Sequence, residues 1–355
     1  MKVRLVLYGL IIYVTFKIFE RHLLPYNRTT SPVQNSFDIF RKTVVWKDRV
    51  ENSEKSGKTT SSECILKEMD SLTESSTVRK RSKIVMIGDS ITQQSFSAEL
   101  SGFGAYLADI YQRRADVFNR GFSGYNTDWL LHYLANTEEG KEDVFSLKQV
   151  GLVTIFMGAN DASCEKNNPR HHVPVERFQS NLRSIISLCR QYFGKDVRII
   201  IIGAPPVHHP SRLDYQIQRY GRNGATGVLE RTLQLSGEHA AAAGSVAKQE
   251  NLPFLNLWEE MQNAVPRCSD PQEEAWSEFL SDGLHLSAKG NLFVGKKLQT
   301  LIETSFPEFA VIPDPKTGFP GSSGSSSGKS IDFVAPWHDQ IDHKNTESAF
   351  SNRYT

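Results

Sequence analysis

Residues 83–90 read KIVMIGDS, an apolar run that ends in a glycine, an acidic residue and a serine. The run predicts a buried strand that stops at Gly88. Four later stretches share this apolar character and also predict strands: residues 117–119, 152–157, 197–202 and 254–257. Strands that are apolar almost throughout are typical of a parallel sheet covered by helices on both faces.

The segments between these strands have helical periodicity. One of them repeats apolar residues at spacings of three and four, which predicts one apolar helix stripe: Val175, Phe178, Leu182, Ile185 and Cys189. Pro174, just before it, stands where a first-turn proline would be tolerated. Residues 288–302 predict a final helix with Ser287 as its N-cap. The apolar positions of that helix include Leu292, Leu298 and Leu301.

Strands that alternate with helices predict an α/β fold. We expect a three-layer α/β/α domain with a central, mostly parallel five-stranded sheet. No repeat of fixed period is visible in the sequence.

The chain begins with basic residues ahead of an apolar run, LVLYGLIIYVTF at residues 5–16. The run is shorter than the roughly 20 residues of a usual membrane span. However, Lys17 can snorkel, and the apolar character continues to residue 19. No small-x-small cleavage site follows, which favours an uncleaved signal anchor over a cleaved signal peptide within residues 1–26. We therefore predict a membrane tether through residues 3–19.

An anchor of this kind would leave its basic flank in the cytosol and the rest of the chain in the lumen of the ER or Golgi. A glycosylation sequon at residues 27–29 fits exposure to the lumen. If the run is instead cleaved as a signal peptide, the protein is secreted. The alternative is an apolar N-terminal helix on a cytoplasmic protein.

Composition divides the rest of the chain. Residues 27–80 are polar, show no sustained period and predict a stem or linker. Residues 81–308 hold all the predicted strands and form the predicted catalytic domain. Residues 309–355 form a C-terminal extension, in which PGSSGSSSGKS at residues 320–330 is typical of a flexible spacer.

Charge and cysteine content give little indication of further partners. The net charge is +1, so nothing points to nucleic acid. The four cysteines permit disulfides in an oxidising compartment or remain free thiols, and the sequence leaves their pairing open: Cys64, Cys164, Cys189 and Cys268. No CxxC or Cys/His cluster occurs, so we expect no structural metal site. The oligomeric state is also left open.

Four short segments carry groups that suit one kind of chemistry. They are GDS at residues 88–90, NRGFSG at 119–124, GAND at 158–161 and DGLH at 282–285. Three of them lie at predicted strand ends, and ligands bind beyond the carboxyl ends of the strands in an open parallel sheet. We therefore expect the segments to converge at one edge. Together they supply what serine-based acyl transfer needs: a nucleophile, oxyanion donors and an acid–base pair.

Ser90 is the candidate nucleophile. Gly88 permits a tight turn from strand to helix, which would place the Ser90 hydroxyl near a helix N-terminus that favours negative charge. The Ser90 N–H could be the first oxyanion donor. The alternative is that Ser90 only caps the next helix.

The other oxyanion donors come from the second and third segments. Gly124 can bring its backbone N–H close to a ligand because it has no Cβ. Gly121 offers the same property, so this argument does not choose between them. Asn160 carries a side-chain amide that can donate without charge. The alternatives are ordinary turns for the glycines and an Asx-turn for Asn160.

His285 is the candidate general base and then acid, and Asp282 could orient its ring and stabilise the imidazolium. The spacing of three residues lets one local turn hold both side chains. The alternative is a solvated Asp282 beside a His285 that is satisfied elsewhere.

Longer blocks around these segments resemble a known family, the SGNH (GDSL-type) hydrolase superfamily, and within it the isoamyl acetate-hydrolysing esterases. The resemblance lies in IGDSITQ at residues 87–93, NRGFSGYNT at 119–127, GAND at 158–161 and SDGLHLS at 281–287. It covers roughly residues 82–307 and extends to APW at residues 335–337.

The resemblance implies a flavodoxin-like SGNH fold and a serine mechanism that needs no metal or organic cofactor. It implies Ser90 as nucleophile, with Asp282 and His285 completing the triad. Gly124 and Asn160 are implied as oxyanion donors beside the Ser90 N–H.

The chain also departs from the subfamily. Asp89 keeps the residue that is structural in the family, but Phe103 stands where the subfamily often carries Trp, which leaves the preferred acyl chain open. Residues 207–226 are rich in His, Arg, Gly and Tyr. They form either a lid or substrate loop or, as the simpler alternative, a surface excursion.

We therefore predict a serine esterase, a carboxylic ester hydrolase whose small-molecule ester substrate is an acetate, acting through an acyl-enzyme. An O-acetyl esterase for glycans of the secretory pathway is an alternative that uses the same residues. A non-catalytic, membrane-tethered module is a third reading, against which the intact set of site residues argues.

Overall fold

The computed structural model describes residues 81–222, 230–265, 274–311 and 341–345. Five strands form one sheet in the order β2-β1-β3-β4-β5, and all neighbouring strands are parallel. The strands are β1 (Ser82–Gly88), β2 (Ala115–Gly121), β3 (Val150–Phe156), β4 (Arg198–Ile202) and β5 (Phe254–Leu255). The predicted α/β class and the five-stranded parallel sheet are confirmed.

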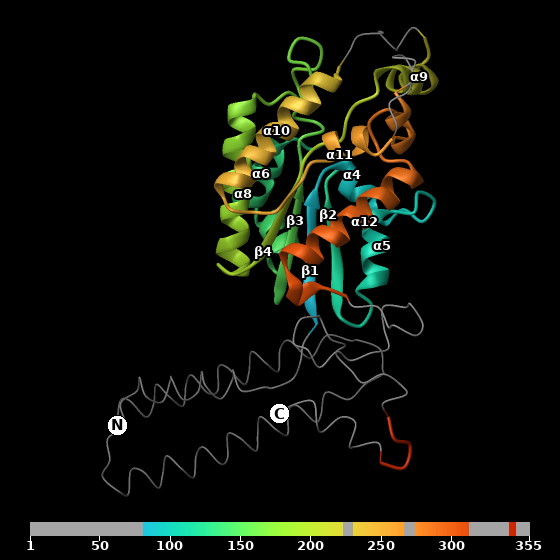
Figure 1. Cartoon of the computed structure of the whole chain (residues 1–355). Coiled ribbons are helices and arrows are strands. Elements are labelled where there is room, and N and C mark those ends of the chain that lie inside the picture. Colours follow the sequence, from blue (N-terminus) through green and yellow to red (C-terminus); the bar gives the residue numbers. More distant parts are fainter. Residues whose placement is uncertain (1–80, 223–229, 266–273, 312–340, 346–355) are drawn as a thin grey trace, which may run out of the picture. The chain divides into compact units, whose positions relative to one another are not determined.

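Helices cover both faces of the sheet (Figure 1). One layer consists of α6 (Thr127–Asn136), α8 (Val175–Phe193) and α10 (Leu233–Gln249). The other consists of α5 (Phe103–Ile110), α11 (Leu257–Asn263) and α12 (Ala288–Ser305). The remaining α-helices are α4 (Ser90–Gln93), α7 (Glu138–Gly140) and α9 (His209–Tyr220). Short 3₁₀ turns span Gln94–Phe96, Ala275–Phe279 and Pro307–Phe309, and a π turn spans Lys141–Phe145.

Two strand boundaries differ from those predicted. β2 extends beyond residues 117–119, because its backbone pairs with β1 from Ala115 to Gly121 even though several of its side chains are polar. β5 ends at Leu255, before the predicted residue 257, because Asn256 caps the start of α11. The first three residues of the NRGFSG segment, 119–121, therefore belong to β2, and the last three form the start of the following loop.

The predicted helices form with small changes at their ends. Pro174 is the N-cap of α8 and precedes its first turn. The predicted apolar stripe of α8 faces the core. Ser287 is the N-cap of α12, as predicted, and its hydroxyl accepts the N–H of Gly290 at 3.1 Å. Leu292 of α12, expected on the apolar face, is 40% exposed.

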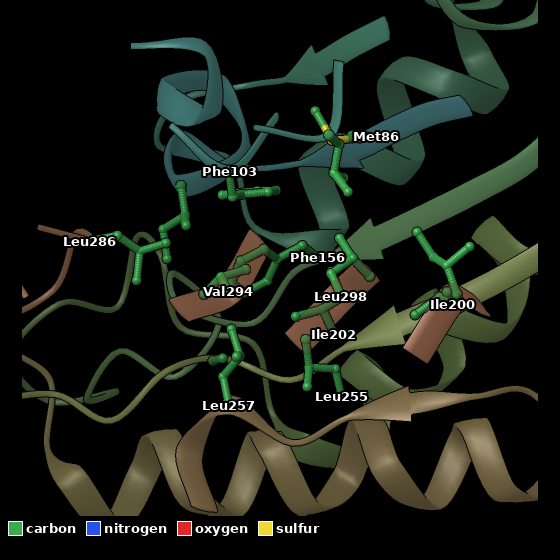
Figure 2. Close-up of a cluster of buried hydrophobic side chains, with 14 of the residues drawn as sticks. Met86, Phe103, Phe156, Ile200, Ile202, Leu255, Leu257, Leu286, Val294 and Leu298 are labelled. Atoms are coloured by element: carbon green, nitrogen blue, oxygen red, sulfur yellow. The ribbon is translucent and has the colours of Figure 1, made fainter. Parts of the chain in front are cut away.

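Side chains of the central strands alternate between the two helical layers. Ile84 and Met86 pack with α5, α11 and α12, whereas Val85 and Ile87 pack with α6, α8 and α10. Figure 2 shows the first of these clusters, in which Phe103 lies close to Phe156. Two buried apolar layers thus cover the sheet on both faces, and the first three motif segments lie at the carboxyl ends of β1, β2 and β3.

Several predictions about the chain ends fall outside the described residues: the anchor at 1–26 with its tether at 3–19, the stem at 27–80 and the spacer at 320–330. Within the described ranges, no helix is both long and apolar enough to cross a membrane. Cys164 and Cys189 are free thiols.

Candidate active site

Ser90 lies immediately beyond the carboxyl end of β1. Gly88 closes the strand, and a Cβ there would lie 2.7 Å from the carbonyl oxygen of Phe156, so the turn into α4 requires glycine. Asp89 is the N-cap of α4, and its Oδ1 accepts the N–H of Ile91 at 2.9 Å. Asp89 therefore caps the helix, which leaves the Ser90 side chain free for another partner.

That partner is His285. Ser90 Oγ lies 2.9 Å from His285 Nε2, and His285 Nδ1 lies 2.8 Å from Asp282 Oδ2. A carboxylate can only accept a hydrogen bond, so the ring proton sits on Nδ1 and Nε2 faces the hydroxyl as an acceptor. The structure thus brings the three predicted residues together in the order that lets imidazole take the serine proton.

One tight turn holds Asp282 against His285. Asp282 Oδ1 accepts the backbone N–H of Leu284 at 3.0 Å and that of His285 at 2.8 Å. Gly283 sits between them with a φ of +79°, a conformation that favours glycine. The carboxylate is therefore bound on both oxygens, unlike the solvated Asp282 of the alternative reading.

Arg212, on α9, is a second partner of the Asp282 carboxylate. Its Nη1 donates to Asp282 Oδ2 at 2.6 Å. Burial by itself would raise the pKa of Asp282, but hydrogen bonds from the His285 ring and backbone, together with the Arg212 charge, outweigh it and hold that pKa below its usual value. Asp282 is thus ionised at neutral pH, as an orienting carboxylate must be.

The structure distinguishes the two glycines that the sequence left open. Gly121 ends β2, and its N–H donates to Asn119 Oδ1 at 2.9 Å. Gly124 has a φ of +81° and open space where a Cβ would be. Within the described part of the chain, neither the Gly124 nor the Ser90 N–H is bonded to an acceptor. Gly124 is therefore the glycine whose N–H is available to a ligand.

Asn160 follows β3 in the loop that begins at Gly158. Its Nδ2 donates to the carbonyl oxygen of Tyr125 at 2.9 Å, and its Oδ1 accepts from Arg231 Nη2 at 3.0 Å. The side chain thus contacts two distant segments and forms no Asx-turn. One of its two amide hydrogens remains for a ligand.

Two further carboxyl groups lie buried beside the site. Burial raises the pKa of Asp89 to about 7, against the bond from Ile91 that lowers it. Burial also raises the pKa of Asp161, whose Oδ1 accepts both the N–H and the hydroxyl of Thr127. Asp161 therefore ties the GAND segment to the first turn of α6 and so fixes the loop that carries Gly124.

The sequence did not reveal two arginines of this site. Arg212 falls within residues 207–226, the segment predicted as either a lid or a surface excursion. The start of its helix α9 packs on Gly283, where a Cβ would lie 2.3 Å from the His208 carbonyl oxygen. The unusual composition of that segment was the only signal. Arg231 lies outside all four motifs, and nothing in its local sequence marks it.

The arrangement contains the groups for acyl transfer to a hydroxyl. In such a reaction Ser90 can act as nucleophile and His285 as its base, and the N–H groups of Ser90, Gly124 and the Asn160 side chain can act as donors. Among the described residues, no group of three or more His, Cys, Asp or Glu could hold a metal ion.

Comparisons with known proteins found a matching family, similar sequences and similar structures. Residues 86–292 match the GDSL-like Lipase/Acylhydrolase family. The isoamyl acetate-hydrolyzing esterase 1 homolog of Bos taurus is 40% identical over 224 residues, which are 62% of this chain and 81% of that protein. The isoamyl acetate-hydrolyzing esterase of Saccharomyces cerevisiae is 31% identical over 64% of this chain and 88% of its own. The lipase/acylhydrolase from Enterococcus faecalis, a solved structure, is 26% identical over 63% of this chain and 96% of its own, with a TM-score of 0.44.

Proposed function

Because this chain belongs to the GDSL-like lipase/acylhydrolase family and is a carboxylic ester hydrolase, we propose that it is a serine esterase that hydrolyses small acetate esters through an acyl-enzyme. The observation that carries the proposal is the continuous chain of contacts from Ser90 Oγ through His285 to Asp282.

In the first half of the reaction, His285 Nε2 takes the proton of Ser90 as Oγ attacks the ester carbonyl carbon. The oxyanion of the tetrahedral intermediate accepts hydrogen bonds from the Ser90 and Gly124 N–H groups and from Asn160 Nδ2. The protonated His285 then gives its proton to the leaving alcohol, and the acyl group stays on Oγ.

In the second half, His285 takes a proton from water, and the hydroxide attacks the acyl carbonyl carbon. The oxyanion returns to the same donors, and Oγ leaves with the proton that His285 holds. The products are a carboxylic acid and the free enzyme. No step requires a metal or an organic cofactor.

Two relatives support an acetate ester as the substrate, since one is an isoamyl acetate-hydrolyzing esterase and the other a homolog of such an enzyme. A panel of p-nitrophenyl acetate, butyrate and octanoate, with isoamyl acetate, tests this proposal. We expect kcat/KM to be highest for the acetates. A preference for octanoate would contradict the proposed substrate while leaving the esterase class intact.

A second candidate substrate is an O-acetylated glycan of the secretory pathway. The apolar run at residues 5–16 with its basic flank, and the sequon at 27–29, favour it, because they suit a signal-anchored chain whose domain lies in the ER or Golgi lumen. Release of acetate from acetylated xylan at a higher kcat/KM than from isoamyl acetate would move the proposal to glycans. The non-catalytic reading is set aside, because the matching family is one of lipases and acylhydrolases and the similar proteins are named as esterases or their homologs.

A further inference from the structure

Arg231 is a buried cation that contacts Asn160. Its side chain is only about 6% exposed. It enters from the segment before α10, where a β-bridge pairs Arg231 with Ser163 and the N–H of Cys164 donates to Glu230. The backbone on both sides of the guanidinium is therefore fixed.

The guanidinium contacts the oxyanion-side segment at two points. Arg231 Nε donates to the carbonyl oxygen of Ala159 at 2.9 Å, and Nη2 donates to Asn160 Oδ1 at 3.0 Å. The two acceptors belong to adjacent residues, so the planar fork of the arginine binds the backbone and the side chain of the GAND segment at once.

This contact decides which way the Asn160 amide faces. An arginine has donors only, so Asn160 must turn its oxygen toward Arg231 and its NH₂ group to the opposite side. On that side, one hydrogen reaches the carbonyl oxygen of Tyr125, the residue after Gly124. The second hydrogen is left for the oxyanion. The same amide thereby ties its own donor to the loop that carries the Gly124 donor.

We propose that Arg231 is a positioning residue that orients the Asn160 amide as an oxyanion donor. The inference rests on the proposed serine esterase activity, because only that reaction forms an oxyanion at this place. Arg231 itself does not touch the substrate; it acts through Asn160.

The charge of Arg231 adds to this effect. Burial lowers the pKa of Arg231 to about 10, which still leaves the guanidinium protonated at neutral pH. A charged donor on Oδ1 polarises the amide and makes its N–H groups better donors. This contribution grows as negative charge develops on the oxyanion, so it favours the transition state over the bound ester.

A double-mutant cycle between Arg231 and Asn160 tests the proposal, with p-nitrophenyl acetate as substrate. We expect Arg231→Met to lower kcat by about 10- to 100-fold with KM nearly unchanged, and Asn160→Ala to lower it by about 10²–10³-fold. In the Asn160→Ala background, Arg231→Met should cost less than about 2-fold, because the amide that it orients is gone. Arg231→Lys should fall between, since one ammonium cannot hold both acceptors.

The cycle separates positioning from a merely structural role. If Arg231 only supported the fold, its loss would lower kcat by the same factor in both backgrounds, and that result would overturn the proposal. An unchanged kcat in Arg231→Met would overturn it as well. If urea titrations show that Arg231→Met has no folded state, Arg231→Lys replaces it in both backgrounds. A smaller loss of kcat in the Asn160→Ala background again supports positioning, and an equal loss again overturns it.

Two further variants complete the experiment. Arg190→Met removes a cation of α8 that pairs with Glu250 at 2.5 Å, away from the site, and should leave kcat unchanged. Ser90→Ala must abolish turnover. If Ser90→Ala kept its rate, the proposed function itself would fall, whereas loss in Ser90→Ala with additive Arg231 and Asn160 effects would remove only the role of Arg231.

Discussion

The side chain of Ser90 is free to contact His285 because Asp89, the residue before it, caps the helix. Asp89 takes the N-cap of α4, so the hydroxyl of Ser90 is not used by the backbone and bonds to His285 instead. The cap is buried completely, and one of its oxygens, Oδ2, has no partner among the described residues. A carboxyl in that environment is disfavoured when ionised.

The titration of Asp89 leads to a prediction about stability. Its pKa rises from 3.8 to about 7 on folding, so between these values the native state holds a proton that the unfolded state has lost. The free energy of unfolding therefore falls as pH rises through this window and levels off above about pH 7. Asp89→Asn removes this dependence, so its stability relative to the wild type should rise by up to about 4 kcal/mol between about pH 4 and pH 8.

Urea unfolding of both proteins at the two pH values measures the difference. Asp161 has a raised pKa as well, and its charge also raises the pKa of Asp89, so the difference between the two proteins reports Asp89 together with its interaction with Asp161. A wild-type and an Asp89→Asn curve that run parallel from about pH 4 to pH 8 would show that Asp89 does not hold a proton in the native state.

Among the elements of the fold, the two glycines of the NRGFSG segment have different roles: Gly121 ends β2 and Gly124 lies in the loop that follows. A Cβ on Gly121 would lie 2.0 Å from the backbone nitrogen of Gln93, so this glycine allows β2 to lie against α4. A Cβ on Gly124 would meet nothing, but its φ of +81° strains any other residue. The first glycine is required by packing and the second by backbone conformation.

This difference predicts that an alanine at the two positions has effects of different size on stability and on kcat. Gly121→Ala should lower the free energy of unfolding by more than about 2 kcal/mol, because backbone must move to make room. Gly124→Ala should cost only about 1 kcal/mol, the cost of a left-handed residue, while lowering kcat more than this stability loss explains. Denaturant titrations and p-nitrophenyl acetate rates of the pair check both; a larger stability loss in Gly124→Ala would contradict the assignment.

Element types were readable in the sequence, whereas some boundaries and partners were not. Local sequence was enough where the pattern was strong. Continuous apolar runs predicted β1, β3 and β4, and apolar residues at spacings of three and four predicted α8. β2 is an edge strand with polar side chains, and its full length depends on pairing with β1, which no local pattern records. The four motif segments carry all the predicted site residues. Arg212 and Arg231 could not be predicted, because they contact Asp282 and Asn160 only through tertiary structure.

At the scale of the molecule, the strand order explains why distant segments meet. β1 lies between β2 and β3, so Ser90, Gly124 and Asn160 follow three neighbouring strands at their carboxyl ends. Asp282 and His285 arrive from the other end of the sequence, just before α12. All strands of a parallel sheet end at the same edge, so the sequence could predict that the segments meet there. Periodicity alone does not give the order of the strands, so it could not predict which segments are neighbours.

The proposed lumenal location is a property of the whole chain. If residues 3–19 anchor the full chain with its basic flank in the cytosol, added protease should leave residues 81–308 intact in sealed microsomes and digest them once detergent opens the membrane. A variant without residues 3–19 is the control and should remain outside the vesicles. Digestion of the full chain in sealed microsomes would favour the cytoplasmic alternative.

The proposed reaction begins with the attack of Ser90 Oγ on the ester carbonyl carbon. The most direct measurement is the steady-state hydrolysis of p-nitrophenyl acetate by the full chain, by Ser90→Ala and by Ser123→Ala, an exposed serine of the Gly124 loop. We expect kcat to fall by at least about 10⁴-fold in Ser90→Ala and to stay unchanged in Ser123→Ala. Turnover by Ser90→Ala at the wild-type rate would show that Ser90 is not the nucleophile.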